Sequence, residues 1–247
     1  MTDSLSFKPP IIAHRGASAY APENTMAAFV KAAQLGAKWV EFDVMLSADG
    51  TPIVFHDELL DRTTNEQGDP GHFDYAYLAT LDSGSWFGYR FANERIPTLL
   101  AVVEFLRSMK MSANIELKPL PGQAKQLVNI VLEQMRPFLQ PSASTFLFSS
   151  FSIETLQLLR QHSSSCLIGL LMHEWLTDWQ ALSDELACVS IHLNQEIVTQ
   201  HNIQLIKDTG RAVLSYTVNR PLQALEFYSW GVDAVFTDVP DKIMAVL

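Results

Sequence analysis

Ionisable side chains gather at the ends of apolar segments in the first half of this chain. They form five short groups: His14-Arg15-Gly16, Glu23-Asn24-Thr25, Glu41-Phe42-Asp43, His56-Asp57 and Glu116-Leu117-Lys118. A buried charge is costly unless it is paired or bound to a metal. Carboxylates, histidines and cations in this arrangement predict a metal site that binds a phosphate.

The carboxylates have the spacing of metal ligands on strands. Glu41 and Asp43 are two residues apart, so a strand places them on one face and the apolar residues around them on the other. Glu116 and Lys118 repeat the pattern on a second strand. Three carboxylates without cysteine favour Mg²⁺ or Ca²⁺ over zinc. The structural alternative is ion pairing, for instance between Glu116 and Lys118.

The histidines and cations suit acid–base chemistry on a phosphate. His14 closes the first apolar strand and His56 closes a returning one, and either can act as a general acid or base near neutral pH. Arg15 offers a planar pair of donors that matches a phosphate, and Lys118 adds a point charge. The alternatives are structural histidines and salt bridges with the nearby acids.

Short apolar strands alternate with helical stretches along the whole chain. The eight predicted strands are Ile11–His14, Lys38–Val44, Ala113–Lys118, Thr145–Ser149, Cys166–Leu171, Ala187–His192, Ala212–Val218 and Asp233–Thr237. The predicted helices are Pro22–Leu35, Leu99–Met109, Gln123–Phe138, Ser152–Gln161, Asp178–Asp184, Gln195–Asp208, Pro221–Trp230 and Pro240–Leu247, with Pro22 and Pro221 in first turns and Ser152 at a helix start. Eight such units indicate an α/β fold, a (β/α)8 TIM-type barrel. An open doubly wound sheet is the alternative.

One unit is longer than the others. After the second strand, a turn at Asp49-Gly50 leads to a returning strand that ends near His56. The following stretch to Ile96 is rich in Gly, Asp, Asn and aromatic residues and lacks a helical period. We expect one domain over residues 1–247 with an insert at about 46–97, a length that is typical of a lid or binding segment.

Composition narrows the class of protein. The 247 residues are 48% hydrophobic and carry a net charge of −10, which argues against a nucleic-acid partner. No apolar run approaches the roughly 18 residues of a membrane span, and Met1–Pro10 lacks the features of a signal peptide. Cys166 and Cys188 are expected to be buried free thiols, so the cytoplasm is the expected location. No pattern indicates an oligomer, although one is possible.

The motifs together resemble the glycerophosphodiester phosphodiesterase family, most closely its short cytosolic bacterial members. The resemblance spans essentially the whole chain. It is carried by His14-Arg-Gly, Glu23-Asn-Thr, Gly36-Ala-Lys-Trp-Val-Glu-Phe-Asp-Val, Asp49-Gly50, Val54-Phe-His-Asp, Asp61-Arg-Thr-Thr, Ile96-Pro-Thr-Leu, Ile115-Glu-Leu-Lys, Ser149-Ser-Phe, Tyr216-Thr-Val-Asn and Phe236-Thr-Asp-Val-Pro.

The resemblance implies a β/α barrel with an insert after its second strand and one bound divalent cation, Mg²⁺ or Ca²⁺. It assigns Glu41, Asp43 and Glu116 to the metal, and His14 and His56 to acid–base catalysis. It assigns Arg15 and Lys118 to the phosphate, with Glu23 beside the site. Tyr216 stands where many members carry tryptophan, which keeps an aromatic wall in the pocket.

The implied reaction converts a small-molecule glycerophosphodiester to glycerol-3-phosphate and an alcohol such as choline, ethanolamine or glycerol. The nucleophile is water or the substrate's own 2-hydroxyl, and the sequence leaves both routes open. The alternatives are a lysophospholipase D or cyclising phospholipase on the same barrel, and a barrel that binds its ligand without turnover.

Overall fold

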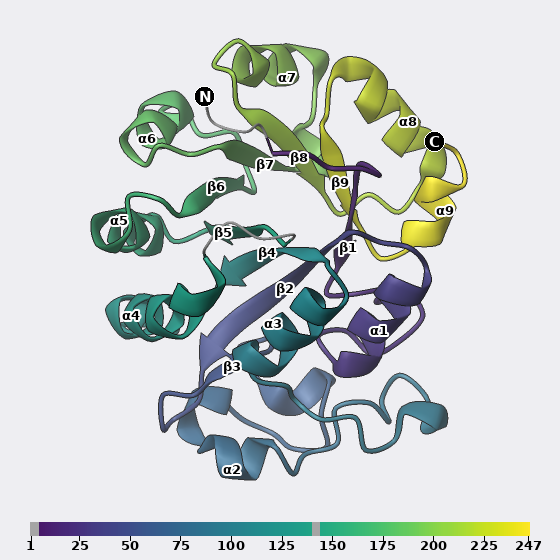
Figure 1. Cartoon of the computed structure of the whole chain (residues 1–247), viewed down its shortest axis with the longest axis vertical. Coiled ribbons are helices and arrows are strands. Elements are labelled where there is room, and N and C mark those ends of the chain that lie inside the picture. Colours follow the sequence, from purple (N-terminus) through teal and green to yellow (C-terminus); the bar gives the residue numbers. More distant parts are fainter. Residues whose placement is uncertain (1–4, 140–143) are drawn as a thin grey trace.

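The structure is a computed structural model that describes residues 5–139 and 144–247, and its strands close into a barrel (Figure 1). Eight of them run parallel, and the ring closes because β1 pairs with both β2 and β9. In order around the barrel they are β1 (Ile11–His14), β2 (Trp39–Leu46), β4 (Ser112–Leu117), β5 (Phe146–Ser150), β6 (Leu167–Met172), β7 (Ser190–Asn194), β8 (Ala212–Tyr216) and β9 (Ala234–Thr237). The predicted barrel is confirmed, and the open doubly wound sheet is wrong.

The helices cover the outside of the barrel (Figure 1). They are α1 (Met26–Gln34), α3 (Leu99–Ser108), α4 (Ala124–Met135), α5 (Ile153–His162), α6 (Trp179–Glu185), α7 (Gln200–Lys207), α8 (Pro221–Trp230) and α9 (Pro240–Met244). The largest apolar cluster joins the helices to the outer faces of the strands, and it includes Val40, Phe42 and Val44 of β2. Phe42 meets Phe29 of α1 edge to face at 5.7 Å. The outer face of β2 is therefore apolar, which leaves its acids on the inside.

Several predicted helix starts are confirmed, among them Leu99 and Pro240, and two are wrong. Pro221 begins α8, and Ser152 caps α5 by accepting a hydrogen bond from the Thr155 amide. Helix α1 begins at Met26 instead of Pro22, because Thr25 is extended and its Oγ1 caps the helix. The predicted Gln195–Asp208 helix is split into a 3₁₀ turn, η5 (Gln195–Ile197), and α7, which Thr199 caps.

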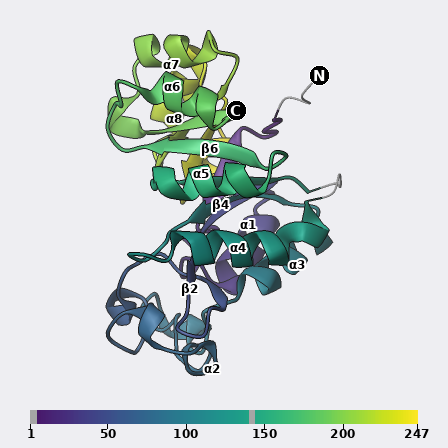
Figure 2. The ribbon, with the colours of Figure 1, turned by 90° about the vertical axis from the view of Figure 1, so that its left-hand side faces the viewer.

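The insert lies between β2 and α3. It begins with β3 (Pro52–Val54), which returns antiparallel to β2, so His56 lies two residues beyond the strand instead of closing it. The insert continues through η1 (Leu60–Arg62), η2 (Pro70–His72), α2 (Tyr75–Leu78) and η3 (Tyr89–Phe91). Its apolar cluster is built on Met45, Ile53, Phe55, Leu60, Leu78, Leu81 and Ile96. Figures 1 and 2 place the insert at the end of the molecule opposite α7.

One of the expectations from composition is confirmed by the structure. Cys166 and Cys188 are buried free thiols, as predicted. Among the described residues, no helix has the length and apolar character needed to cross a membrane. The expectation for Met1–Pro10 falls partly on residues 1–4, which lie outside the described residues.

Candidate active site

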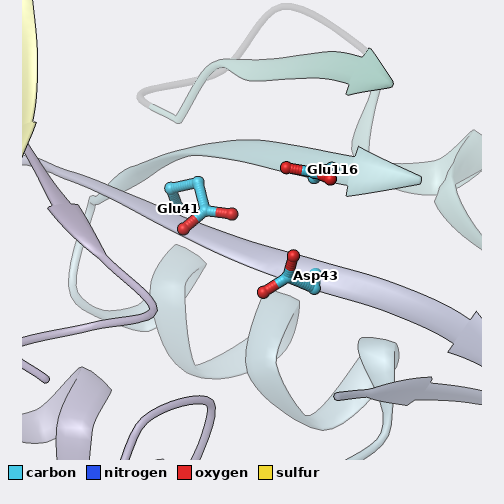
Figure 3. Close-up of side chains that lie close together, drawn as sticks. All are labelled: Glu41, Asp43 and Glu116. Atoms are coloured by element: carbon cyan, nitrogen blue, oxygen red, sulfur yellow. The ribbon is translucent and has the colours of Figure 1, made fainter. Parts of the chain in front are cut away.

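Three carboxylates, two buried and one partly buried, meet at the mouth of the barrel. Glu41 and Asp43 project from β2, and Glu116 projects from β4, where Asp43 and Glu116 are partners in the strand register. One oxygen of each carboxylate lies within 4.8 Å of the other two (Figure 3). Glu41 is 3% exposed and Asp43 is 1% exposed. The structure thus brings together the three residues that the sequence predicts as metal ligands.

The electrostatics of this cluster fit a divalent cation. Burial and the neighbouring carboxylates raise the pKa of Glu41 well above its ordinary value. Burial and Asp43 raise the pKa of Glu116 to about 8. Burial also disfavours the Asp43 carboxylate, but Arg15, His56 and Lys118 offset that effect and lower its pKa. Because three adjacent carboxylates cannot all ionise cheaply, a bound cation would stabilise them. The site of all-oxygen ligands suits Mg²⁺ or Ca²⁺.

Two cations stand beside the carboxylates. The Arg15 backbone amide donates to Glu41 Oε2 at 3.0 Å, and its Nη1 donates to Glu23 Oε1 at 2.7 Å. Arg15 Nε lies 3.5 Å from Asp43 Oδ2. Lys118 Nζ lies 3.8 Å from Asp43 Oδ1, so its ion pair is with Asp43 and not with Glu116 as the alternative supposed. Glu23 therefore contacts the carboxylate cluster indirectly, through Arg15.

Each histidine is held by a carboxylate. His14 Nδ1 lies 2.7 Å from Asp238 Oδ1, and His56 Nδ1 lies 2.6 Å from Asp57 Oδ1. In both residues the hydrogen bond fixes Nδ1 and leaves Nε2 as the nitrogen available for proton transfer. Burial lowers the pKa of His56. Both imidazoles therefore have the orientation that acid–base chemistry needs.

Most of the predicted site residues line one cavity of about 220 Å³, whereas Lys118 borders a neighbouring solvent-open hollow that also reaches His56. Its lining includes charged and polar residues and an apolar wall that contains Tyr216. The lining residues are His14, Arg15, Glu41, His56, Asn114, Glu116, Phe151, Leu171, Tyr216, Thr217 and Phe236. The Tyr216 hydroxyl donates to the Met172 carbonyl at 3.0 Å, and its ring meets Phe151 edge to face at 6.0 Å. The cavity thus combines charged groups with the aromatic side chain expected at Tyr216, as a small amphipathic ligand requires.

The family model of the glycerophosphoryl diester phosphodiesterases matches residues 14–242. The chain belongs to this family. It is 33% identical to a glycerophosphodiester phosphodiesterase of Caldanaerobacter subterraneus subsp. tengcongensis, with 96% of this chain and 97% of that one aligned. The predicted enzyme class, a phosphoric diester hydrolase acting on glycerophosphodiesters, is confirmed at the level of the family.

Solved structures of relatives have the same fold. An Oleispira antarctica phosphodiesterase, solved in complex with the product sn-glycerol-3-phosphate, is 39% identical, with a TM-score of 0.93 over 96% of each chain. A glycerophosphodiester phosphodiesterase from Agrobacterium tumefaciens str. C58 is 31% identical, with a TM-score of 0.81 over 98% of this chain and 100% of that one.

Sequence reasoning missed two residues that hold site side chains. Asp238 follows β9 and accepts hydrogen bonds from His14, Ser18 and Asn219. Asn24 donates from Nδ2 to Asp43 Oδ2 at 2.9 Å. Both residues belong to motifs that carry the family resemblance. Their partners are too distant in the sequence for residue spacing to reveal the contacts.

Asn114 is a third residue that the sequence did not single out. It precedes Glu116 by two positions on β4, so both side chains enter the barrel, and it is 1% exposed. Its Nδ2 donates to Ser149 Oγ at 2.9 Å. Asn114 lines the cavity, and its buried Oδ1 has no hydrogen-bond partner among the described residues. Buried polar atoms normally have partners, so this acceptor at the cavity wall is unusual.

Proposed function

We propose that this enzyme hydrolyses glycerophosphocholine, glycerophosphoethanolamine, glycerophosphoglycerol and similar diesters to glycerol-3-phosphate and an alcohol. The observation that carries the proposal is that a cluster of three carboxylates meets two carboxylate-held histidines beside one cavity. The glycerol-3-phosphate complex of the Oleispira antarctica relative supports the same product here.

The binding roles follow from charge and position. Glu41, Asp43 and Glu116 would hold one Mg²⁺ or Ca²⁺ ion, which supplies Lewis-acid polarisation of the phosphate. Arg15 and Lys118 bind the phosphate oxygens and offset the negative charge that grows during attack. Glu23 orients Arg15 through their 2.7 Å contact. The wall that contains Tyr216 packs against the carbon skeleton of the substrate.

The two histidines divide the proton transfers. One Nε2 accepts the proton of the attacking hydroxyl as its oxygen bonds to phosphorus. The other Nε2 donates a proton to the alcohol oxygen as the P–O bond breaks. The attacking hydroxyl belongs either to water or to the substrate's 2-hydroxyl, and the second route forms a cyclic phosphate that water then opens. Asp238 and Asp57 hold the two imidazoles in place during both transfers.

The first experiment measures glycerol-3-phosphate release from glycerophosphocholine with Mg²⁺, with Ca²⁺ and with a chelator. We expect release that the chelator abolishes and one metal restores. No release with either metal, from protein shown to be folded, would contradict the proposal.

A second candidate substrate is a lysophospholipid, cleaved by lysophospholipase D or cyclising chemistry at the same site. The apolar wall favours it, because Phe151 at its edge is 48% exposed and offers contact to an acyl chain. A lysophospholipid assayed beside glycerophosphocholine separates the two.

We also propose that the protein is located in the cytoplasm, in keeping with its two buried free thiols.

A further inference from the structure

We infer that Arg62 of the insert is a positioning residue that holds His56 and Arg15 in place at the same time. This inference rests on the proposed function, in which these two side chains act on the phosphate. Arg62 lines neither the metal cluster nor the cavity of about 220 Å³. Its effect on the reaction must therefore pass through the residues that it contacts.

The Arg62 guanidinium bridges two carboxylates. Its Nη1 donates to Glu23 Oε2 at 2.8 Å and its Nη2 donates to Glu23 Oε1 at 2.7 Å. On the other side, Nε donates to Asp57 Oδ2 at 2.6 Å and Nη2 donates to Asp57 Oδ1 at 3.0 Å. Only a planar fork makes two paired contacts of this kind, so lysine is no substitute.

Each carboxylate passes the constraint to the site. Glu23 Oε1 also accepts from Arg15 Nη1 at 2.7 Å, and Asp57 Oδ1 also lies 2.6 Å from His56 Nδ1. The sequence of contacts is therefore Arg15, Glu23, Arg62, Asp57, His56, with alternating charge up to the histidine. It joins the β1–α1 loop to the loop after β3.

The bridge also keeps both carboxylates ionised in a partly buried setting. The Glu23 and Asp57 side chains are 13% and 23% exposed. Burial alone would favour their protonated forms, but the hydrogen bonds from Arg62 lower the pKa of both, that of Asp57 to about 2. Without Arg62, both carboxylates would lose a neighbouring cation and the hydrogen bonds that fix their orientation.

The backbone that carries Arg62 is held independently of its side chain. Leu60, at the start of η1, is fully buried in the insert's apolar cluster. Its amide donates to the Gly68 carbonyl at 2.8 Å, and its carbonyl accepts from the Thr64 amide at 3.0 Å. The Arg62 side chain is 46% exposed and borders a solvent-open hollow shared with His56, Asp57 and Lys118. Truncation at Arg62 should therefore leave the fold intact and leave a gap that a small solute can enter.

The test is the activity of Arg62→Ala with and without methylguanidinium. We expect kcat/KM for glycerophosphocholine to fall by about 10²-fold, the effect of misplacing reacting groups by about 1 Å. Millimolar methylguanidinium should restore much of the lost activity, and methylammonium should not, because it lacks the planar fork.

The matched control is Arg95→Ala, since Arg95 is also an exposed arginine of the insert but donates to the Thr80 carbonyl. Its activity should equal that of the unmodified enzyme.

Two further variants separate the ends of the bridge. Glu23→Gln should mainly weaken the binding of glycerol-3-phosphate, measured by calorimetry, because it frees Arg15. Asp57→Asn should mainly lower kcat, because it frees His56. These variants also serve if Arg62→Ala does not fold.

The outcomes separate a failure of the Arg62 bridge from a failure of the proposed function. Full activity in Arg62→Ala, or loss that methylammonium restores equally well, would overturn the inference. Equal effects of Glu23→Gln and Asp57→Asn on both kcat and product affinity would overturn it too. An unmodified enzyme without activity would instead overturn the proposed function, and the calorimetric arm, which needs no turnover, would still test the bridge.

Discussion

At the scale of single residues, the site is organised by carboxylates in two different roles. Glu41, Asp43 and Glu116 face one another and lack enough protein cations to neutralise them. Asp57 and Asp238 each face a histidine and are strongly hydrogen-bonded. The first group fits the proposed metal and the second fits the proposed proton transfers, and the difference lies in their partners instead of their residue type.

The histidine pair gives the first prediction. His14→Ala or His56→Ala should lower kcat by about 10²–10⁴-fold with the fold retained, because each removes an acid–base group. Steady-state assays of glycerol-3-phosphate release measure the effect. His162→Ala on the outside of α5 is the control, since His162 is exposed and contacts only a backbone carbonyl among the described residues. Near-normal turnover in either site variant would contradict the two-histidine scheme.

Asp238 gives a prediction about pH. Burial alone would raise its pKa, but hydrogen bonds from His14, Asn219 and Ser18 hold it at about 2. A depressed pKa stabilises the fold above the ordinary value of about 4 and loses that contribution as pH falls toward 2. The stability difference between the unmodified protein and Asp238→Asn should therefore shrink between pH 5 and pH 2. Denaturant unfolding at several pH values measures it, and a constant difference would contradict the assignment.

At the scale of elements, helix α1 links stability to the site. Thr25 caps the helix with its Oγ1, and the two residues before it, Glu23 and Asn24, contact Arg15 and Asp43. Asn24 has a φ of 56°, in the left-handed region that asparagine tolerates better than most residues. The cap therefore fixes the loop that supplies both contacts.

Capping gives the third prediction. Thr25→Ala and Thr199→Ala should each lower the free energy of unfolding by about 1 kcal/mol, because each removes an N-cap hydrogen bond. Only Thr25→Ala should also reduce kcat/KM, because Glu23 and Asn24 directly precede the α1 cap. The residues directly before Thr199, the cap of α7, hold no side chain of the site. Denaturant unfolding and activity assays test both effects together. Equal activity in the two variants would show that the α1 cap does not position the site.

The elements also show what the sequence was able to predict. Strand β2 was predictable because Glu41 and Asp43 alternate with Val40, Phe42 and Val44, so strand geometry alone puts the acids inside. The meeting of Asp43 with Glu116 then follows from neighbouring parallel strands. The start of α1 was not predictable from Pro22, because proline is tolerated both in a first turn and in the loop before a cap.

The contacts between distant loops lay beyond the sequence. Glu23 and Arg62 are 39 positions apart, and His14 and Asp238 are 224 positions apart. No periodicity connects such pairs, since their meeting depends on barrel closure and on the path of the insert. Sequence motifs marked these residues, and the three-dimensional structure supplied their partners.

At the scale of the whole molecule, the carboxylate cluster proposed to bind a metal lowers the stability of the metal-free fold. The barrel buries Glu41 and Glu116 next to Asp43, and burial with mutual repulsion raises the pKa of both. A raised carboxyl pKa means that the folded state becomes less favourable as pH rises from the ordinary value of about 4 to the raised value. The metal-free protein should thus lose stability toward pH 8, and a cation should restore it.

The last prediction compares the protein with Glu41→Gln, which keeps the shape of the side chain and removes its charge. In chelator at pH 8, Glu41→Gln should be at least as stable as the unmodified protein, because it relieves repulsion in the cluster. A cation at a hundred times its Kd should stabilise the unmodified protein by about 2.7 kcal/mol. Glu41→Gln should gain much less, so the order of stability reverses.

The control is Glu104→Gln, on the exposed side of α3, which should behave as the unmodified protein does. Thermal unfolding with Mg²⁺, Ca²⁺ and chelator measures all three, and equal metal stabilisation of Glu41→Gln would place the cation elsewhere.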